Sequence, residues 1–382
     1  MFERILGHVQ AIESLRAALR ADRIHHAWIF HGPVGIGKYT TALAFAAGLL
    51  DPDAQINLAG EVDIDPDGTT AQLVRSGQHP DLHIISKELA RFSEHAPTRD
   101  RKQTNIPIQV VRQFVVAPAA RTGHGRSADT SSARATKVFI IDEAEMLDGR
   151  AQDTLLKTLE EPAPGTVLIL VTSREHELSP TIRSRCRRLA FHPLTEPELD
   201  QWRDGLTDGL ATDLTDHQWD DLKRIGRGSP GLVQTMMAGG MLGWLETIRS
   251  ILAQLDDGRL PADAGPALAA HIEEFAQATV KQNKQASKDA ANRHGVSLLF
   301  TMMAEEFRVR LAQSLAGSTN DPRAAMQVIR WIEYIELAQQ QLSDNVNLKL
   351  VLDNLVIQLA GAASDEPHDP VCPGWFDTAG CI

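Results

Sequence analysis

The chain has 382 residues, which is more than one hydrophobic core usually serves, so two or three domains are expected. Its net charge of −12 argues against an autonomous, high-affinity DNA-binding protein, because counterion release requires a basic surface. Cys186, Cys372 and Cys381 lack zinc-ligand spacing and no apolar run approaches the ~18 residues of a membrane span, so we expect a cytoplasmic protein without zinc or membrane contact.

The first predicted element is a helix from residue 8 to 21, where Ile12, Leu15 and Leu19 recur at helical spacing. A short apolar run from Ala27 to Phe30 predicts a strand after it. The strand leads directly into a glycine-rich loop.

This loop has the pattern of a phosphate-binding loop that opens a helix. Gly32, Gly35 and Gly37 let the backbone curl so that its N–H groups point inward, and Lys38 can reach the terminal phosphates of ATP. The next residue is Tyr39 instead of Ser or Thr, and its phenol extends too far from the backbone to replace the hydroxyl that ligates Mg²⁺. The loop therefore predicts nucleotide binding and leaves hydrolysis open. The expected nucleotide-binding residues are Gly32, Pro33, Val34, Gly35, Ile36, Gly37, Lys38, Tyr39 and Thr40.

Further apolar runs, Leu82 to Ile85, Val138 to Ile141 and Val167 to Thr172, alternate with helical stretches. This alternation predicts an α/β fold with a doubly wound parallel sheet. Two polar segments, Asp51 to Ser76 and Arg121 to Thr136, are expected to be exposed excursions from it. The helical stretches between the runs are Gln109 to Val116 and Asp153 to Glu160.

Two carboxylates, Asp142 and Glu143, follow the second of these apolar runs. Polar groups at the carboxyl end of a buried parallel strand are typical of Mg²⁺ chemistry. Asp142 would hold the hydration shell of the metal, and Glu143 would orient or deprotonate the attacking water. The alternative is an acidic helix N-terminus after a core strand.

After residue 193 the strand signals largely stop and helical periodicity continues, with one break at Arg227 to Gly231. The sequence thus predicts helical domains after the α/β domain. The predicted ranges are 1–192 for the nucleotide-binding domain, 193–241 for a small helical domain, 242–362 for a larger helical domain and 363–382 for a disordered tail.

Several segments carry a family resemblance when they are taken together. They are Gly7-His8, Arg23 to Pro33, Gly77 to His83, Ile140 to Glu145, Leu155 to Pro162, Thr181 to Cys186 and Asn345 to Leu350. In this order they resemble the clamp-loader branch of the AAA+ ATPases in bacterial DNA polymerase III, and most closely its delta-prime type. The resemblance implies an AAA+ domain, a helical lid domain and a helical collar domain for oligomerisation.

The triplet Ser184-Arg185-Cys186 matters most for mechanism. In this family its arginine touches the γ-phosphate bound by a neighbouring subunit, so the resemblance implies that Arg185 is an arginine finger in trans. Such a guanidinium contributes about 10³ to 10⁵ in rate in favourable cases. The alternatives are a solvated basic face, or contacts to DNA phosphates, made by Arg183, Arg185, Arg187 and Arg188.

Two other family positions are less distinctive here. The resemblance places Thr172 or Ser173 at the strand tip that helps to position the attacking water, although strand ends also carry hydroxyls that merely satisfy a turn. An active member has an arginine after a Gly-Ser pair, whereas this chain continues from Gly228-Ser229 into Pro230, Gly231 and Leu232. The family's zinc module is excluded by ligand chemistry, because residues 51–76 contain no cysteine.

The resemblance and the departures together imply a subunit that holds ATP weakly and hydrolyses it poorly, with Mg²⁺ binding in doubt. Its implied partners are gamma/tau-type ATPase subunits and the delta subunit in a hetero-pentameric ring, the sliding clamp and primer-template DNA. Two alternatives stay open. One is a gamma/tau-type motor that hydrolyses ATP itself with Lys38, Asp142 and Glu143, and the other is a scaffold that binds no nucleotide.

Overall fold

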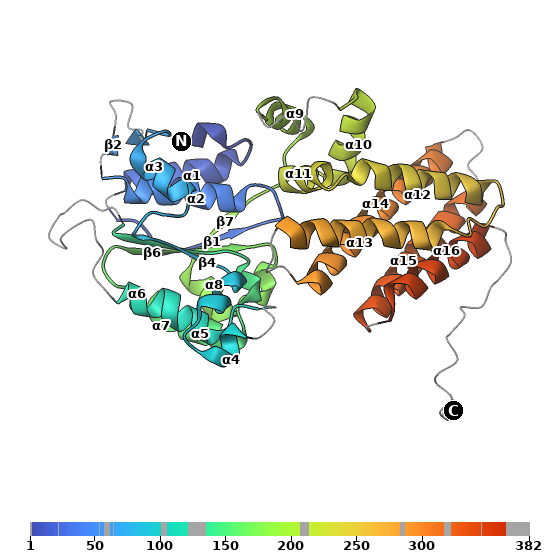
Figure 1. Cartoon of the computed structure of the whole chain (residues 1–382). Coiled ribbons are helices and arrows are strands. Elements are labelled where there is room, and N and C mark those ends of the chain that lie inside the picture. Colours follow the sequence, from blue (N-terminus) through green and yellow to red (C-terminus); the bar gives the residue numbers. More distant parts are fainter. Residues whose placement is uncertain are drawn as a thin grey trace. The chain divides into compact units, whose positions relative to one another are not determined.

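The computed structural model describes residues 2–21, 23–52, 54–56, 62–63, 65–100, 105–120, 135–206, 214–282, 287–316, 322–344 and 346–363. Its contacts divide the chain into two compact units, Met1–Asp213 with Gly226–Val233, and Leu214–Ile225 with Gln234–Ile382. The first unit holds the sheet and the second is helical (Figure 1). The predicted domain limits at 192 and 241 stay predictions, and residues 364–382 of the predicted tail lie outside the described residues.

The first unit is built on a five-stranded parallel sheet with the order β4-β5-β6-β1-β7. The doubly wound parallel α/β sheet of the prediction is confirmed, and the connections between its strands pack on both faces. The strands are β1 (Ala27–His31), β4 (Leu82–Ile85), β5 (Lys137–Ile141), β6 (Thr166–Thr172) and β7 (Arg187–Ala190).

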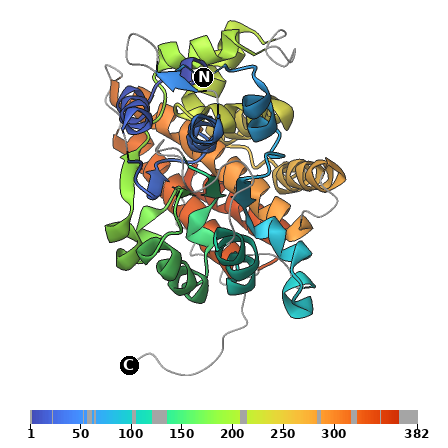
Figure 2. The same ribbon diagram turned by 90° about the vertical axis from the view of Figure 1, so that its left-hand side faces the viewer.

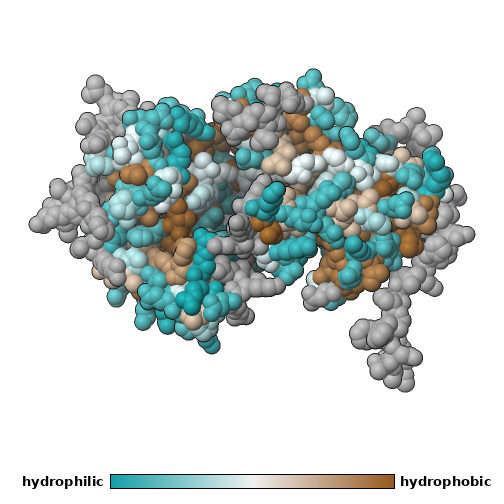
Figure 3. Space-filling view, viewed as in Figure 1, coloured by the Kyte–Doolittle hydropathy of each residue, from teal (hydrophilic) through white to brown (hydrophobic). Residues whose placement is uncertain are grey.

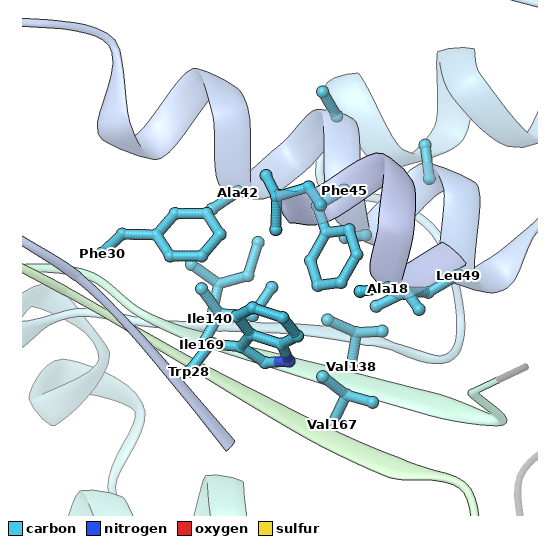
Figure 4. Close-up of a cluster of buried hydrophobic side chains, with 14 of the residues drawn as sticks. Ala18, Trp28, Phe30, Ala42, Phe45, Leu49, Val138, Ile140, Val167 and Ile169 are labelled. Atoms are coloured by element: carbon cyan, nitrogen blue, oxygen red, sulfur yellow. The ribbon is translucent and has the colours of Figure 1, made fainter. Parts of the chain in front are cut away.

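Alternate residues of the strands enter two separate hydrophobic clusters. On one face Trp28, Phe30 and Ile140 pack against Phe45 of α2, as Figure 4 shows. On the other face the neighbours in sequence pack against α5 and α7. In the view of Figure 2 the blue helices lie above the strands of the sheet and the darker green helices lie below them.

The helices of the first face are α1 (Val9–Arg20), α2 (Lys38–Leu50) and α3 (Thr69–Arg75). The second face has α5 (Ile108–Val111), a π-helical turn η3 (Arg112–Val116), α6 (Ala117–Ala119), α7 (Gly149–Glu160) and α8 (Pro180–Arg185). The helix predicted from 109 to 116 is therefore interrupted by a π turn just before Pro118, which has no amide hydrogen to donate.

Shorter elements complete the first unit. Part of the segment predicted as an exposed excursion is α3, where Val74 is buried in the core, and residues 121–134 of the second excursion lie outside the described part of the chain. The short elements are η1 (Phe2–Arg4), β2 (Gln55–Ile56), β3 (Val62–Asp63), η2 (Lys87–Phe92), α4 (Ala96–Arg99), η4 (Ala144–Met146), η5 (Glu175–Glu177) and α9 (Glu196–Asp204).

The second unit is helical, in agreement with the prediction. Helix α13 packs on α14, α14 on α15 and α15 on α16, and α16 closes back on α13, so the four form a bundle that α12 joins. The bounds are α10 (Asp216–Gly226), α12 (Met241–Asp256), α13 (Ala264–Gln282), α14 (Lys288–Ala316), α15 (Pro322–Ser343) and α16 (Leu348–Ala363), while α11 (Pro230–Ala238) starts in the first unit. In the described parts of the chain, every helix is too short or too polar to cross a membrane.

Candidate functional site

The phosphate loop connects β1 to α2 at the carboxyl edge of the sheet. Gly35 and Gly37 have φ values of +75° and +99°, a backbone conformation that favours glycine. Gly37 is the residue before the first turn of α2, so the loop ends at the N-terminus of a 13-residue helix. This backbone fits a bound phosphate, because the helix N-terminus supplies unpaired N–H groups and positive potential.

His8 supports the loop from outside. Its Nε2 lies 2.7 Å from the carbonyl oxygen of Ile36, and because a carbonyl only accepts, Nε2 must donate. Burial lowers the pKa of His8, although the hydrogen bond to the Ile36 carbonyl opposes this effect. Apart from its place in the family pattern, no feature of the sequence around His8 predicts this role.

Lys38 is nearly buried, with 6% of its surface exposed. Its Nζ donates to the carbonyl oxygens of Gly32, at 2.7 Å, and Pro33, both in the loop itself. Burial lowers the pKa of the Lys38 ammonium to about 8, and the carboxylates of Glu145 and Asp142 oppose this change. The lysine therefore lies in the loop with two acidic groups within electrostatic reach.

The position after the lysine does not fit a Mg²⁺ ion. The Tyr39 side chain packs against the core cluster beneath α2, and burial followed by the charge of Asp142 raises its pKa. Thr40 is exposed, and the hydroxyl of Thr41 donates to the Gly37 carbonyl at 2.9 Å. In the described segments, no group of three or more His, Cys, Asp or Glu could hold a metal ion.

Asp142 and Glu143 lie at the carboxyl end of β5, as predicted, but their environments differ. Burial raises the pKa of Asp142, and the charges of Glu143 and Glu145 act in the same direction. Glu143 has a positive φ of +48°, and its Oε2 accepts a hydrogen bond from Lys87 Nζ at 2.7 Å. The expected catalytic base is thus engaged in an ion pair, while Asp142 faces the loop lysine and Tyr39.

A third carboxylate, Glu145, connects η4 to the tip of β6. Its Oε1 accepts hydrogen bonds from the amide of Ser173, at 3.2 Å, and from the Ser173 hydroxyl. Burial raises the pKa of Glu145, but the hydrogen bonds from Ser173 and Thr172 outweigh it and the pKa is lowered overall. The sequence placed Thr172 and Ser173 at this edge but missed Glu145 as their partner.

The first residues of α11 lie directly against the phosphate loop. Ser229 Oγ donates to the Val34 carbonyl at 2.9 Å, and the Gly231 amide donates to the Gly35 carbonyl at 2.8 Å. A Cβ atom on Gly231 would lie 2.8 Å from the Gly35 Cα, so only glycine permits this approach. Leu232 follows, so the cation of an active family member is absent from its expected position.

Arg185 lies at the amino ends of the strands, whereas the phosphate loop lies at their carboxyl ends. It ends α8 two residues before β7, and the first residue of β7, Arg187, pairs with Trp28 near the amino end of β1. The phosphate loop begins after the carboxyl end of β1, so roughly 10 Å of strand separates them. The Arg185 guanidinium, 37% exposed, pairs with Glu160 Oε1 at 2.8 Å and donates to the Thr181 carbonyl at 3.1 Å.

The structure therefore brings the phosphate loop, Asp142, Glu143, Thr172 and Ser173 to one edge, and leaves Arg185 outside this group.

A family model described as "DNA polymerase III, delta subunit" matches residues 7–195. The delta' subunit of DNA polymerase III from Pseudomonas aeruginosa is 30% identical over 218 residues, which cover 56% of this chain and 57% of that protein. The tau/gamma subunit from Haemophilus influenzae is 28% identical over 200 residues, covering 52% of this chain and 25% of that protein.

A crystal structure of a DNA polymerase III gamma subunit-related protein from Thermotoga maritima aligns at 15% identity and a TM-score of 0.45, covering 92% of this chain and 99% of that one. The chain spans little more than half the length of the first relative and a quarter of the second. The family model and both relatives are described as subunits of one assembly, DNA polymerase III. The chain belongs to the clamp-loader family of DNA polymerase III.

Proposed function

We infer that the chain is a delta-prime-type clamp-loader subunit that provides Arg185 to the ATP site of a neighbouring subunit. The observation that carries this proposal is the position of Arg185. It lies at the amino edge of the sheet, whereas the chain's own phosphate loop lies at the carboxyl edge. The Arg185 side chain cannot reach from the amino ends of the strands to a nucleotide in the chain's own loop at their carboxyl ends. Any nucleotide that Arg185 contacts must therefore be bound by another molecule.

The contacts of Arg185 suit this role. Glu160 and the Thr181 carbonyl fix the guanidinium before a partner arrives, and more than a third of the side chain stays exposed. A prepositioned guanidinium stabilises charge on a transferred phosphoryl group without reorganising during the reaction. The family relation supports the assignment, because the triplet around Arg185 matches the family's finger motif.

The chain's own site supports weak, non-productive ATP binding. Tyr39 offers no short hydroxyl to Mg²⁺, Glu143 is paired with Lys87, and Leu232 replaces the second phosphate-contacting cation. If ATP binds, residues 32–40 would hold its phosphates and Asp142 would face them. The γ-phosphate would then lack both a well-placed metal and a free base.

The second unit supports assembly with other subunits. Brown side chains gather on the surface of this unit near α15 and α16 in Figure 3, and surface groups of this kind mark interaction sites. We propose contacts with gamma/tau-type subunits and the delta subunit in a hetero-pentameric ring, which acts on the sliding clamp and primer-template DNA in the cytoplasm. The exposed large apolar residues of α15, α16 and the connection between them are Met326, Ile329, Leu337, Val346, Leu350 and Ile357.

The motor alternative has one supporting observation, the similarity to tau/gamma subunits. It requires Lys38, Asp142 and Glu143 to catalyse hydrolysis within this chain. ATP turnover by the isolated chain separates the two. We expect no turnover above background, whereas Lys38-dependent turnover would establish a motor. The scaffold alternative predicts no saturable ATP binding with or without Mg²⁺.

The finger itself is tested in an assembly reconstituted with the clamp and primed DNA. We compare ATP turnover with this chain as wild type, as Arg185→Ala and as Arg187→Ala. The last variant is the matched control, because it removes another exposed guanidinium from the same edge of the sheet. Size-exclusion chromatography verifies that each assembly is intact.

The proposal predicts that Arg185→Ala lowers ATP turnover at the neighbouring site by about 10³-fold while Arg187→Ala changes it less than threefold. Equal losses from both variants would indicate a general basic surface instead. Unchanged turnover with Arg185→Ala in an intact assembly would refute the finger.

A further inference from the structure

Glu145 holds a place in the candidate site that the proposed function does not explain. It belongs to η4 after β5, while Ser173 follows the adjacent strand β6, and β6 lies beside β1, whose end opens the phosphate loop. The order β5-β6-β1 therefore places Ser173 between Glu145 and the loop. Both donors of Ser173, the amide and the hydroxyl, are directed to Glu145 Oε1.

The second oxygen of Glu145 is also informative. Oε2 is buried and has no hydrogen-bond partner within the described residues. A carboxylate with one oxygen fixed by two donors and the other buried keeps its charge in a defined place. Among the charged groups acting on Lys38, Glu145 has the largest effect.

We propose that Glu145 is an internal anion that weakens ATP binding, because it engages the Ser173 donors and holds a negative charge within electrostatic reach of the loop lysine. This inference rests on the proposed nucleotide site and explains how that site is kept at low affinity. A bound triphosphate would have to approach a fixed carboxylate and would find Ser173 already engaged. Glu145 thus determines affinity, while Arg185 acts elsewhere on a neighbour's nucleotide.

Neutralising Glu145 without changing its shape isolates this effect. In Glu145→Gln the amide oxygen can still accept from Ser173, while the new NH₂ group replaces the buried Oε2 and can donate to a phosphate. Removing one negative charge that acts on the loop lysine is expected to tighten ATP binding about 10- to 100-fold.

Isothermal titration calorimetry of the full chain with AMP, ADP and ATP, each with and without Mg²⁺, tests the proposal. The variants are wild type, Glu145→Gln, Ser173→Ala and the double variant. The matched control is Glu88→Gln, which removes one charge from an exposed position on η2. Circular dichroism verifies that every variant is folded.

A charge effect must grow with the charge of the ligand, so the gain from Glu145→Gln should be smallest for AMP and largest for ATP. A purely structural change would alter the three affinities alike. In the double variant part of the gain should be lost, because the released Ser173 hydroxyl is no longer present to contact a phosphate.

The proposal is overturned if folded Glu145→Gln binds ATP within twofold of Glu88→Gln, including the case in which neither binds. It is also overturned if the gain is equal for AMP and ATP. These results concern the isolated chain. They leave the assay of Arg185 in the assembly independent, so failure of one proposal is distinguishable from failure of the other.

Discussion

A buried ion-pair network in the second unit permits a sharp test of how α10 is held. Asp221 of α10 is 7% exposed. It accepts hydrogen bonds from Arg249 Nη1 at 2.8 Å and from Arg224 Nη2 at 3.0 Å. Both arginines also contact Glu306 of α14, at 3.2 Å and 2.5 Å. Replacing Asp221 with Asn keeps the shape but leaves the two guanidinium groups with one carboxylate fewer.

The expected loss follows from burial. Removing one partner of a fully buried ion pair costs about 3 to 5 kcal/mol, because the remaining charge stays in a region of low dielectric. Here Arg249 and Arg224 are 35% and 22% exposed, so water recovers part of the loss. We therefore expect Asp221→Asn to lower the opening free energy of α10 and α12 by about 2 to 3 kcal/mol.

Hydrogen exchange followed by mass spectrometry measures this change helix by helix, which suits a chain of two units better than one unfolding curve. Amides of α12 should exchange about 30- to 150-fold faster, since 1.4 kcal/mol is a factor of ten, while those of β5 and β6 should not change. Asp220→Asn is the control, because Asp220 is 72% exposed and pairs with Lys223 at the surface. Less than threefold faster exchange in α12 would refute this account of the network.

Lowering the pH provides an independent check of the contribution of Asp221 to this network. Burial raises the pKa of Asp221, but the hydrogen bonds and charges of Arg249 and Arg224 outweigh it and the pKa is lowered. A lowered folded-state pKa means that the stabilisation is complete above the unfolded value of about 3.9 and is lost as the pH falls through the folded value. The wild-type protein should therefore lose protection in α12 below about pH 4, and Asp221→Asn should lack this component.

Three further predictions concern the first unit. Asp148→Ala removes the N-cap of α7, where Asp148 accepts from the Ala151 amide at 2.7 Å, and should lower the opening free energy of α7 by about 1 kcal/mol in hydrogen exchange; no change would exclude the cap as a stabilising contact. Burial raises the pKa of the Cys186 thiol to about 12, so peptide mapping should find it unmodified by iodoacetamide at pH 8 until the protein unfolds. Gly231→Ala should speed hydrogen exchange in residues 32–37, because its Cβ would meet Gly35; unchanged exchange would mean that the loop adjusts without strain.

The sheet could be predicted where burial dominates the sequence. Strands β1, β5 and β6 are almost wholly buried, so each reads as a continuous apolar run. Strand β7 was missed because it is an edge strand in which only Leu189 is buried and Arg187, Arg188 and Ala190 are exposed. Its sequence contains no apolar run or alternation that would distinguish it from a loop.

The site shows the same limit. The loop from Gly32 to Lys38 is a local pattern, so its glycines and lysine could be identified directly. Glu145 and Ser173 are 28 residues apart, and Ser229 and Val34 are 195 residues apart. Such pairs depend on which strands become neighbours, and no local spacing specifies this. The sequence therefore identified the groups at this edge but not their partners.

Organisation beyond the sheet depends on long-range contacts as well. The helical domain predicted for residues 193–241 stays a prediction; by their contacts residues 214–225 group with the helical unit and residues 226–233 with the sheet unit. Asp221 and Arg224 on α10 agree with the grouping of residues 214–225 with the helical unit, because buried charges require partners and these two residues find theirs in that unit. Those partners, Arg249 and Glu306, are distant in sequence and became evident only in the folded chain.

Arg185 is proposed to act on the nucleotide of a neighbouring subunit. The most direct measurement is the single-turnover rate constant of ATP cleavage in the preassembled complex, because it isolates the chemical step from product release. With Arg185→Ala we predict a fall of about 10³-fold at the neighbouring site with ATP affinity changed much less. A rate constant within twofold of wild type in an intact complex would contradict the claim.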